Sequence, residues 1–272
     1  MNELVSLTPF ALILCAGIFV QSAAGFAGGL LIVPALMWCG YSIPEAQTAL
    51  LVATIPQNIW GVWSLRDAIS FSRLRFPGLA RIAFLPIGIA VLRMLESYSV
   101  ITLRQVVGAV VSVVTLATAI FHPRPQAKLH PAWAWLTFPL SGFLQGLVGM
   151  GGPAMVFWVQ AHDWDTRQIR GFLFGMYLIS IVPALGVLYT TFGPRIVHPG
   201  LIAAALTPLL LLVTFAGLRF GNWLGRERLR RVTLALLLVM GAAGLAAPWL
   251  SAPPSGERHA ADHPHAVPSL RR

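Results

Sequence analysis

Apolar stretches about as long as a bilayer is thick recur along this chain of 272 residues, from Pro9 to Leu250. About 20 apolar residues in an α-helix cross the hydrocarbon core of a membrane. Inside that core only helices and closed barrels satisfy the backbone polar groups. Charged residues make up 10% of the chain, against about a quarter in soluble domains. The sequence therefore predicts an all-α integral membrane protein that is surrounded by the lipid bilayer.

The apolar stretches divide into ten segments, separated by charged residues or by Pro and Gly. The second and seventh segments are too short to cross a core of about 30 Å comfortably at roughly 1.5 Å per residue. Each is either a short crossing helix or the returning arm of a re-entrant hairpin. The ten segments are 7–24, 26–40, 46–65, 78–95, 100–121, 132–149, 151–161, 170–190, 199–218 and 232–250.

Two glycine-rich breaks interrupt the apolar sequence in the same way. The first, Gln21-Ser22-Ala23-Ala24-Gly25-Phe26-Ala27-Gly28-Gly29, separates segments one and two, and the second, Gln145-Gly146-Leu147-Val148-Gly149-Met150-Gly151-Gly152-Pro153, separates segments six and seven. Two more patterns recur in the same order, so the chain contains an internal repeat of five segments. These patterns are Pro77-Gly78-Leu79 with Pro86, matching Pro199-Gly200-Leu201 with Pro208, and Leu103-Arg104-Gln105-Val106, matching Leu229-Arg230-Arg231-Val232.

The arginine distribution predicts that the two repeats are inverted relative to each other. Basic residues favour cytoplasmic loops. With the 219–231 loop in the cytoplasm, an inverted arrangement places most other basic loop residues inside, whereas a parallel arrangement moves two clusters outside. Both termini then lie on the outer face. The residues predicted inside are Arg66, Arg73, Arg75, Arg124, Lys128, Arg167 and Arg170, and those outside are Arg93, Arg104, Arg195 and the tail.

The predicted domain organisation follows from this repeat. Residues 1–121 form the first membrane repeat, 122–131 a cytoplasmic linker and 132–250 the second membrane repeat. Residues 251–272 are rich in Pro, Ser, His and Arg, without an apolar face, and such a composition predicts a disordered tail.

The glycine-rich breaks are the best candidates for a binding site. An unwound stretch leaves backbone N–H groups without partners, and the positive end of the following helix faces the gap, so the break favours an anion. Gln21, Ser22 and Gln145 either add hydrogen-bond donors for the anion without a buried charge or form hydrogen bonds between helices. Glycines that serve helix packing alone are the alternative, and Phe26 and Met150 are either gates or core residues. The remaining candidates in the breaks are Gly25, Gly28, Gly29, Gly149, Gly151 and Gly152.

Three further polar residues are candidates at membrane depth. Gln57 and Asn58 follow Pro56 in the middle of a segment, where they serve either substrate binding or helix packing. Arg81 lies about one turn from the predicted start of segment 78–95, and Arg93 about one turn from its end. Snorkelling to the interface is the favoured interpretation of both arginines. Arg81 is nevertheless the best cationic partner for a substrate.

Several functional classes are disfavoured. No hydrolase, nucleotide-binding or zinc-protease motif is present, so we predict no enzyme and no cofactor. The net charge of +10 comes without a basic patch interleaved with aromatic residues, so no nucleic acid is expected. No metal site is assigned to His259, His263 and His265 of the tail. No Asp or Glu lies deep in a segment, which leaves open whether protons or sodium ions are coupled, and the sequence leaves homo-oligomerisation open as well.

Each half of the chain contains a glycine-rich break, Gly-x-x-Gly-Gly in the first and Gly-x-Gly-Gly in the second, and closes with Leu-Arg-x-Val. In these motifs the chain resembles the TauE/SafE family of sulfite and organosulfonate exporters. The resemblance covers about residues 7–250. It implies a multi-pass secondary carrier of the bacterial inner membrane for sulfite, sulfoacetate or related sulfonates, with the glycine motifs lining the pathway. Ala27 and Pro153 depart from a fully glycine-rich pattern, so the two sides of the site are expected to differ.

The leading hypothesis is a carrier that works by alternating access, in which both glycine breaks hold one small sulfur-containing anion near the middle of the membrane. Two alternatives stay open at this point. One is an anion channel, and the other is a membrane interaction or assembly protein that transports nothing.

Overall fold

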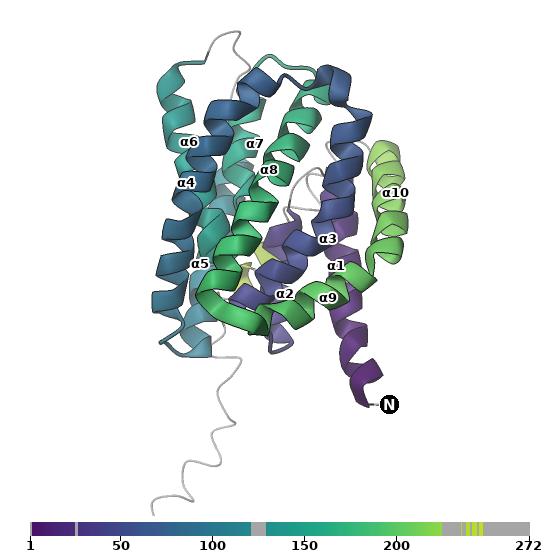
Figure 1. Cartoon of the computed structure of the whole chain (residues 1–272), viewed down its shortest axis with the longest axis vertical. Helices are drawn as coiled ribbons and strands as arrows, with labels where there is room; N and C mark the ends of the chain where they lie inside the picture. The colour runs from purple at the N-terminus through teal and green to yellow at the C-terminus, as the bar shows by residue number, and fades with distance from the viewer. Residues whose placement is uncertain are drawn as a thin grey trace, which may run out of the picture.

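The computed structural model describes residues 2–24, 27–120 and 129–224, together with residues 235, 238, 239, 241–243, 245 and 246 (Figure 1). Within these residues the chain folds into α-helices and short 3₁₀-helices, which confirms the helical prediction. The α-helices are α1 (Asn2–Ala24), α2 (Gly28–Trp38), α3 (Ile43–Ser64), α4 (Phe71–Leu95), α5 (Val100–Ile120), α6 (Pro131–Val148), α7 (Gly152–Gln160), α8 (Thr166–Phe192), α9 (Val197–Ala205) and α10 (Thr207–Leu224), and the 3₁₀-helices are η1 (Arg66–Ala68) and η2 (Gly193–Ile196).

The lengths and apolar surfaces of these helices fit a membrane protein. Among the described residues, three stretches are long and apolar enough to cross a bilayer: Phe71–Leu95, Val100–Ala117 and Arg167–Ala205. Shorter apolar helices cover Leu7–Ala23, Gly28–Trp38 and Thr207–Phe220. Large apolar side chains such as Leu79, Val182 and Leu212 lie exposed on the outside, where lipid would cover them.

Helices α1 and α2 form an antiparallel hairpin. The ring of Phe10 lies 5.0 Å from that of Tyr41, Gly17 faces Ile32, and Gln21 lies against Gly28. These contacts pair the start of α1 with the end of α2. In Figure 1 the chain begins at the lower end, and α2 returns toward that end.

Helices α6 and α7 form a second hairpin at the opposite end of the molecule. The ring of Phe138 on α6 lies 5.0 Å from that of Trp158 on α7, while Ser141 donates a hydrogen bond of 2.6 Å to the carbonyl oxygen of Gly151. Both helices occupy the upper part of Figure 1. The returning helices are the short segments predicted from the sequence.

Each hairpin turns through a residue with left-handed backbone geometry. Gly149 ends α6 at φ 73°, and its N–H group donates to the carbonyl of Gln145, the bond of an αL helix cap. The Met150 N–H group donates to the carbonyl of Leu144. Ala27, just before α2, adopts φ 85°. Glycine takes this conformation freely, whereas a residue with a Cβ is strained in it.

The strain at Ala27 leads to a prediction. Ala27→Gly should fold with an unchanged or raised melting temperature, because relief of strain offsets the lost methyl packing. Ala27→Val should destabilise the protein by about 2 kcal/mol, since a β-branched residue at positive φ is an outlier. Thermal unfolding of the purified variants in detergent checks both. A stable Val variant would show that the turn is not held in this conformation.

The remaining helices surround the two hairpins. Helix α4 packs along α6 and α8, α10 packs along α1, α9 packs along α3, and α3 packs against α8. Glycines bring two of these pairs into backbone contact: Gly142 and Gly146 of α6 face the backbone of α4, and Gly217 of α10 faces the Phe19 carbonyl of α1. The central apolar core lies between these layers and includes Ile32 and Leu36 of α2.

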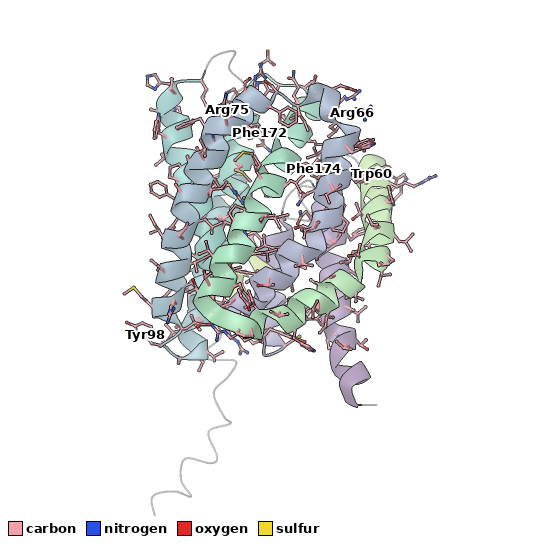
Figure 2. The ribbon with its side chains drawn as sticks, viewed as in Figure 1. Trp60, Arg66, Arg75, Tyr98, Phe172 and Phe174 are labelled. Carbon is pink, nitrogen blue, oxygen red and sulfur yellow. The ribbon has the colours of Figure 1, made fainter. Side chains whose placement is uncertain are left out.

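Contacts among loops place the arginines at two ends. The Arg73 guanidinium lies 5.2 Å from the ring of Trp164, and Gly171 faces Ile69, so the α3–α4 and α7–α8 connections share one end. At the other end Arg195 forms an ion pair of 2.6 Å with Glu96. Figure 2 shows Arg66 and Arg75 at the first end and Tyr98 at the second.

Some segment boundaries differ from the predicted ones. Segment 199–218 is two helices, α9 and α10, which are separated at Leu206. Pro208 follows closely and cannot donate a backbone hydrogen bond into a continuous helix. Helix α4 begins at Phe71, seven residues before the predicted start at 78. Most of segment 232–250, the 122–131 linker up to residue 128 and the tail lie outside the described residues.

Candidate functional site

A cavity of about 50 Å³ lies where the tips of the two hairpins meet. The two glycine motifs are in contact here, because a Cβ built on Gly29 would lie 2.5 Å from the Gly149 carbonyl oxygen. At roughly 10–15 Å³ per water-sized probe, the cavity holds a few water molecules or one small oxyanion. Its lining residues are Gln21, Ala27, Gly28, Gly29, Leu30, Leu50, Leu51, Thr54, Arg81, Gln145, Gly149, Met150, Gly152, Pro153, Tyr177, Ser180 and Ile181.

Two helices begin at this cavity. Helix α2 begins at Gly28 and α7 at Gly152, and both glycines line the cavity. The first N–H groups of a helix have no partner within the helix, and the helix start carries a partial positive charge. The two hairpins therefore direct two positive helix ends at one small space.

The two predicted glutamines fold back over these helix starts. The Gln145 Oε1 atom accepts hydrogen bonds from the Gly151 N–H at 3.3 Å and from Arg81 Nη2 at 3.2 Å. The Gln21 Oε1 atom touches Gly28 so closely that a Cβ there would overlap it. Both side chains are buried and line the cavity. Gln145 is hydrogen-bonded to the turn of its own hairpin, and Gln21 packs against the turn of its own.

Arg81 brings a full positive charge to the cavity. Its side chain is 1% exposed and lies near the middle of α4. Its guanidinium donates to Ser141 Oγ, to the Gly151 carbonyl at 3.4 Å and toward Met155 Sδ at 3.2 Å. The Nε atom has no hydrogen-bond partner. The snorkelling interpretation of Arg81 is therefore wrong, because α4 begins earlier than predicted and carries the side chain into the interior.

Arg93 behaves as the sequence suggested for a residue near a helix end. It lies in the last turn of α4 and is exposed at the surface. There it donates a hydrogen bond of 3.3 Å to the Thr191 carbonyl oxygen.

The charge of Arg81 is not matched by an acid among the described residues, whose ion pairs are Arg66 with Asp67 and Arg195 with Glu96. The side-chain and carbonyl groups that bind its guanidinium are neutral. A guanidinium stays protonated in proteins, and a buried charge without a counter-charge is costly. An anion in the adjoining cavity would lower that cost, so the electrostatics of the site favour an anionic ligand.

Tyr177 and Ser141 were missed by the sequence reasoning. The Tyr177 ring lies 5.7 Å from the Arg81 guanidinium, within cation–π range, and its hydroxyl lies over Gly152. Ser141 positions the guanidinium. Both are polar residues inside apolar segments, one turn of helix from other polar residues, and that signal could have found them. Thr54 and Ser180 also line the cavity, but their hydroxyls donate to carbonyls of their own helices.

The structure does not bring all predicted residues to this cavity. Ser22 and Gln57 line a different cavity between α1, α3, α8 and α10, and Asn58 is buried nearby on α3 without lining either one. Gly151 contributes its backbone groups to Arg81, Ser141 and Gln145. Gly25 and Phe26 lie outside the described residues.

Comparison with known proteins identifies the family of this chain. The model of the "Sulfite exporter TauE/SafE" family matches residues 10–244. A curated relative from Cupriavidus necator (strain H16), "Probable sulfite/organosulfonate exporter TauE", is 24% identical over 245 residues, which cover 88% of this chain and 93% of the relative. No solved structure matches the chain. Since the family model spans most of the sequence, the chain belongs to the TauE/SafE sulfite exporter family of membrane transport proteins.

Proposed function

We propose that this protein is a secondary transporter that exports small sulfur-containing anions, such as sulfite or an organosulfonate, across the bacterial inner membrane. The observation that carries the proposal is Arg81, a buried cation without an acidic partner in the described residues, at a cavity bounded by two helix starts. The name of the Cupriavidus relative supports the same class of substrate.

The size and chemistry of the cavity favour a sulfur oxyanion. Its volume of about 50 Å³ suits one compact head group with three oxygens. Arg81 and Tyr177 offer side-chain donors, and the starts of α2 and α7 offer backbone N–H groups. Guanidinium binds oxyanions through two parallel hydrogen bonds. Sulfite and the head group of a sulfonate present oxygens in the matching geometry, while Leu50, Leu51 and Ile181 close the apolar sides.

Inverted repeats would give this site alternating access. The fourth segment of each half packs on the first and third helices of the other half: α4 on α6 and α8, and α10 with α9 on α1 and α3. The hairpins come from opposite ends. This exchange of partners supports a two-fold relation in the membrane plane, in which rocking of one half against the other opens the site to either side.

The arginines support an orientation. Described arginines near helix ends lie at both ends of the molecule. Those at the α3–α4 end are Arg66, Arg73, Arg75, Arg167 and Arg170, and those at the α4–α5 end are Arg93, Arg104 and Arg195. By the positive-inside bias, the α3–α4 end faces the cytoplasm. The start of α1 then lies on the outer face.

The two glutamines test the proposed site. We expect Gln21→Ala and Gln145→Ala each to lower sulfite transport about tenfold. Gln145→Ala removes hydrogen bonds from Gly151 and Arg81, each worth roughly 1–2 kcal/mol. Gln21→Ala removes the side chain that packs against Gly28 at the start of α2. The measurement is uptake of labelled sulfite into proteoliposomes preloaded with unlabelled sulfite, in which counterflow distinguishes a carrier from a channel. If both variants fold and their counterflow is unchanged, the two glutamines do not contribute to the site.

A further inference from the structure

A second and larger cavity lies beside the central one. Its volume is about 190 Å³, and α1, α3, α8 and α10 contribute its walls. Polar and apolar residues are mixed in its lining, and two arginines from the start of α8 belong to it. The lining residues are Ser22, Gln57, Trp60, Gly61, Ser64, Leu65, Arg167, Arg170, Leu173, Phe174, Thr214 and Leu218.

The two cavities follow each other along the same helices. On α3, Thr54 lines the central cavity, and Gln57, one turn further, lines the second. On α8, Tyr177 lines the central cavity, and Phe174, one turn earlier, lines the second. On α1 the neighbours Gln21 and Ser22 are divided between them. The second cavity therefore continues the first toward the end where α3 finishes and α8 begins.

The polar groups of the second cavity favour an anion. Arg167 and Arg170 lie in the first turns of α8, at the end of the molecule that Arg66 and Arg75 also occupy (Figure 2). Deeper in the cavity, Gln57 is 3% exposed, and its Oε1 atom has no hydrogen-bond partner. A buried amide without a partner on its oxygen is costly. A water molecule from the hydration shell of an anion would donate to this oxygen and relieve this cost.

Apolar groups narrow the space between these polar positions. The Phe174 ring lies directly against Gly61, so closely that no Cβ would fit, and Figure 2 shows Phe174 between α8 and α3. Trp60, Leu173 and Leu218 line the same walls. An organic anion or a partly dehydrated inorganic one can therefore be guided by the arginines and still touch apolar walls.

We propose that this cavity is a second anion-binding site in series with the central one, an inference that rests on the proposed function. We call it the vestibule. It collects sulfite or sulfonate from the end of the molecule where α3 finishes and α8 begins. Arg167 and Arg170 attract the anion, and Gln57 receives it one turn from the central cavity. Charged walls around a narrow cleft raise the local concentration of an oppositely charged ligand by about 10-fold to 1,000-fold.

The first test compares two double variants with equal loss of charge at the same end. Arg167→Gln/Arg170→Gln should raise the sulfite concentration for half-maximal transport about tenfold, leave the maximal rate unchanged, and weaken the dependence on ionic strength. Arg66→Gln/Arg75→Gln is the matched control, because neither residue lines the vestibule, and its half-maximal concentration should change less than twofold. Equal effects of the two double variants, or no effect of either, would overturn the vestibule.

The second test uses a cysteine in the vestibule and does not depend on transport. In a Cys15→Ala/Cys39→Ala background, which removes both native cysteines, Thr214→Cys should react faster with a sulfonate-bearing thiol reagent than with its ammonium-bearing counterpart. An alkanesulfonate should slow the reaction, and Arg167→Gln/Arg170→Gln should abolish the preference. An unreactive Cys, or a preference for the cationic reagent, would contradict the proposal.

The two proposals fail in distinguishable ways. If Arg81→Gln transports normally, the central site is wrong, whatever the thiol reporter shows. Suppose that Arg81→Gln loses transport, while Arg167→Gln/Arg170→Gln transports like its control and does not change the reagent preference of the cysteine. The central site is then supported, and the vestibule is contradicted.

Discussion

Replacement of Arg81 by Gln is expected to lower sulfite transport at least about 100-fold. Each hydrogen bond to a charged group contributes roughly 1.5–3 kcal/mol, and two bonds from the guanidinium to an oxyanion amount to about 3 kcal/mol or more, where about 1.4 kcal/mol is a factor of ten. Glutamine retains a donor but neither the charge nor the paired geometry. The measurement is the initial rate of labelled sulfite counterflow in proteoliposomes.

Two companion variants separate charge from packing. Arg81→Lys keeps the charge without the planar fork and should retain part of the transport. Arg81→Met is similar in length and uncharged, and it should abolish transport with an unchanged or raised melting temperature, because replacement of an uncompensated buried charge by an apolar side chain is neutral or stabilising. A large loss of stability in Arg81→Met would show that the arginine serves the fold instead.

The second large effect is expected at the α4–α6 contact. A Cβ on Gly142 would meet the backbone of Arg81, including its carbonyl carbon at 2.9 Å, and backbone atoms cannot move aside as a flexible side chain can. Gly142→Ala should therefore destabilise the protein by about 2–3 kcal/mol, at the upper end for overpacking, and reduce transport by displacing Arg81. Thermal unfolding and counterflow of the same preparation measure both effects.

The matched control is the same substitution where space is free. A Cβ on Gly186 of α8 meets nothing within 4 Å, and alanine is favoured over glycine in a helix by about 0.5–1 kcal/mol. Gly186→Ala should unfold at the same temperature as the parent protein or higher. Equal melting temperatures for Gly142→Ala and Gly186→Ala would refute the close packing of α4 on α6.

The glycine breaks could be predicted from sequence because their physical signature is local. Glycine inside an apolar segment of membrane length, one turn after a polar amide, indicates a break in the helix without any knowledge of the tertiary contacts. The contact between Gly29 and Gly149 depends on how two distant hairpins dock, and no spacing in the sequence specifies it. The prediction that both breaks hold one ligand remains a proposal.

Arg81 shows where sequence reasoning fell short. Its apparent place near a segment end rested on a start at 78, whereas Ser70 precedes a helix that begins at Phe71. The residues between include Arg73 and Arg75, whose charges hid the first turns of α4 from a search for apolar stretches. The internal repeat indicates the buried position of Arg81. Pro77-Gly78 aligns with Pro199-Gly200, so Arg81 corresponds to Ala203, which is buried.

The break between α9 and α10 shows a different limit. Pro86 and Pro208 occupy corresponding places in the repeat, yet α4 continues through Pro86 while a new helix begins just before Pro208. At Pro86 the surroundings satisfy the backbone group that the proline leaves unbonded, and the helix continues. At Pro208 the chain starts a new helix instead. The same residue in the same register therefore leads to two structures, and only the packing around it decides between them.

A sulfur oxyanion is expected to bind beside Arg81, where the two hairpins meet. The most direct measurement is the melting temperature of the purified protein and of Arg81→Gln, each titrated with sulfite and with an alkanesulfonate, since a ligand that binds the native state raises its stability. We expect a saturable increase in the parent protein and none in the variant. An equal increase in both proteins, or an increase with cations alone, would contradict it.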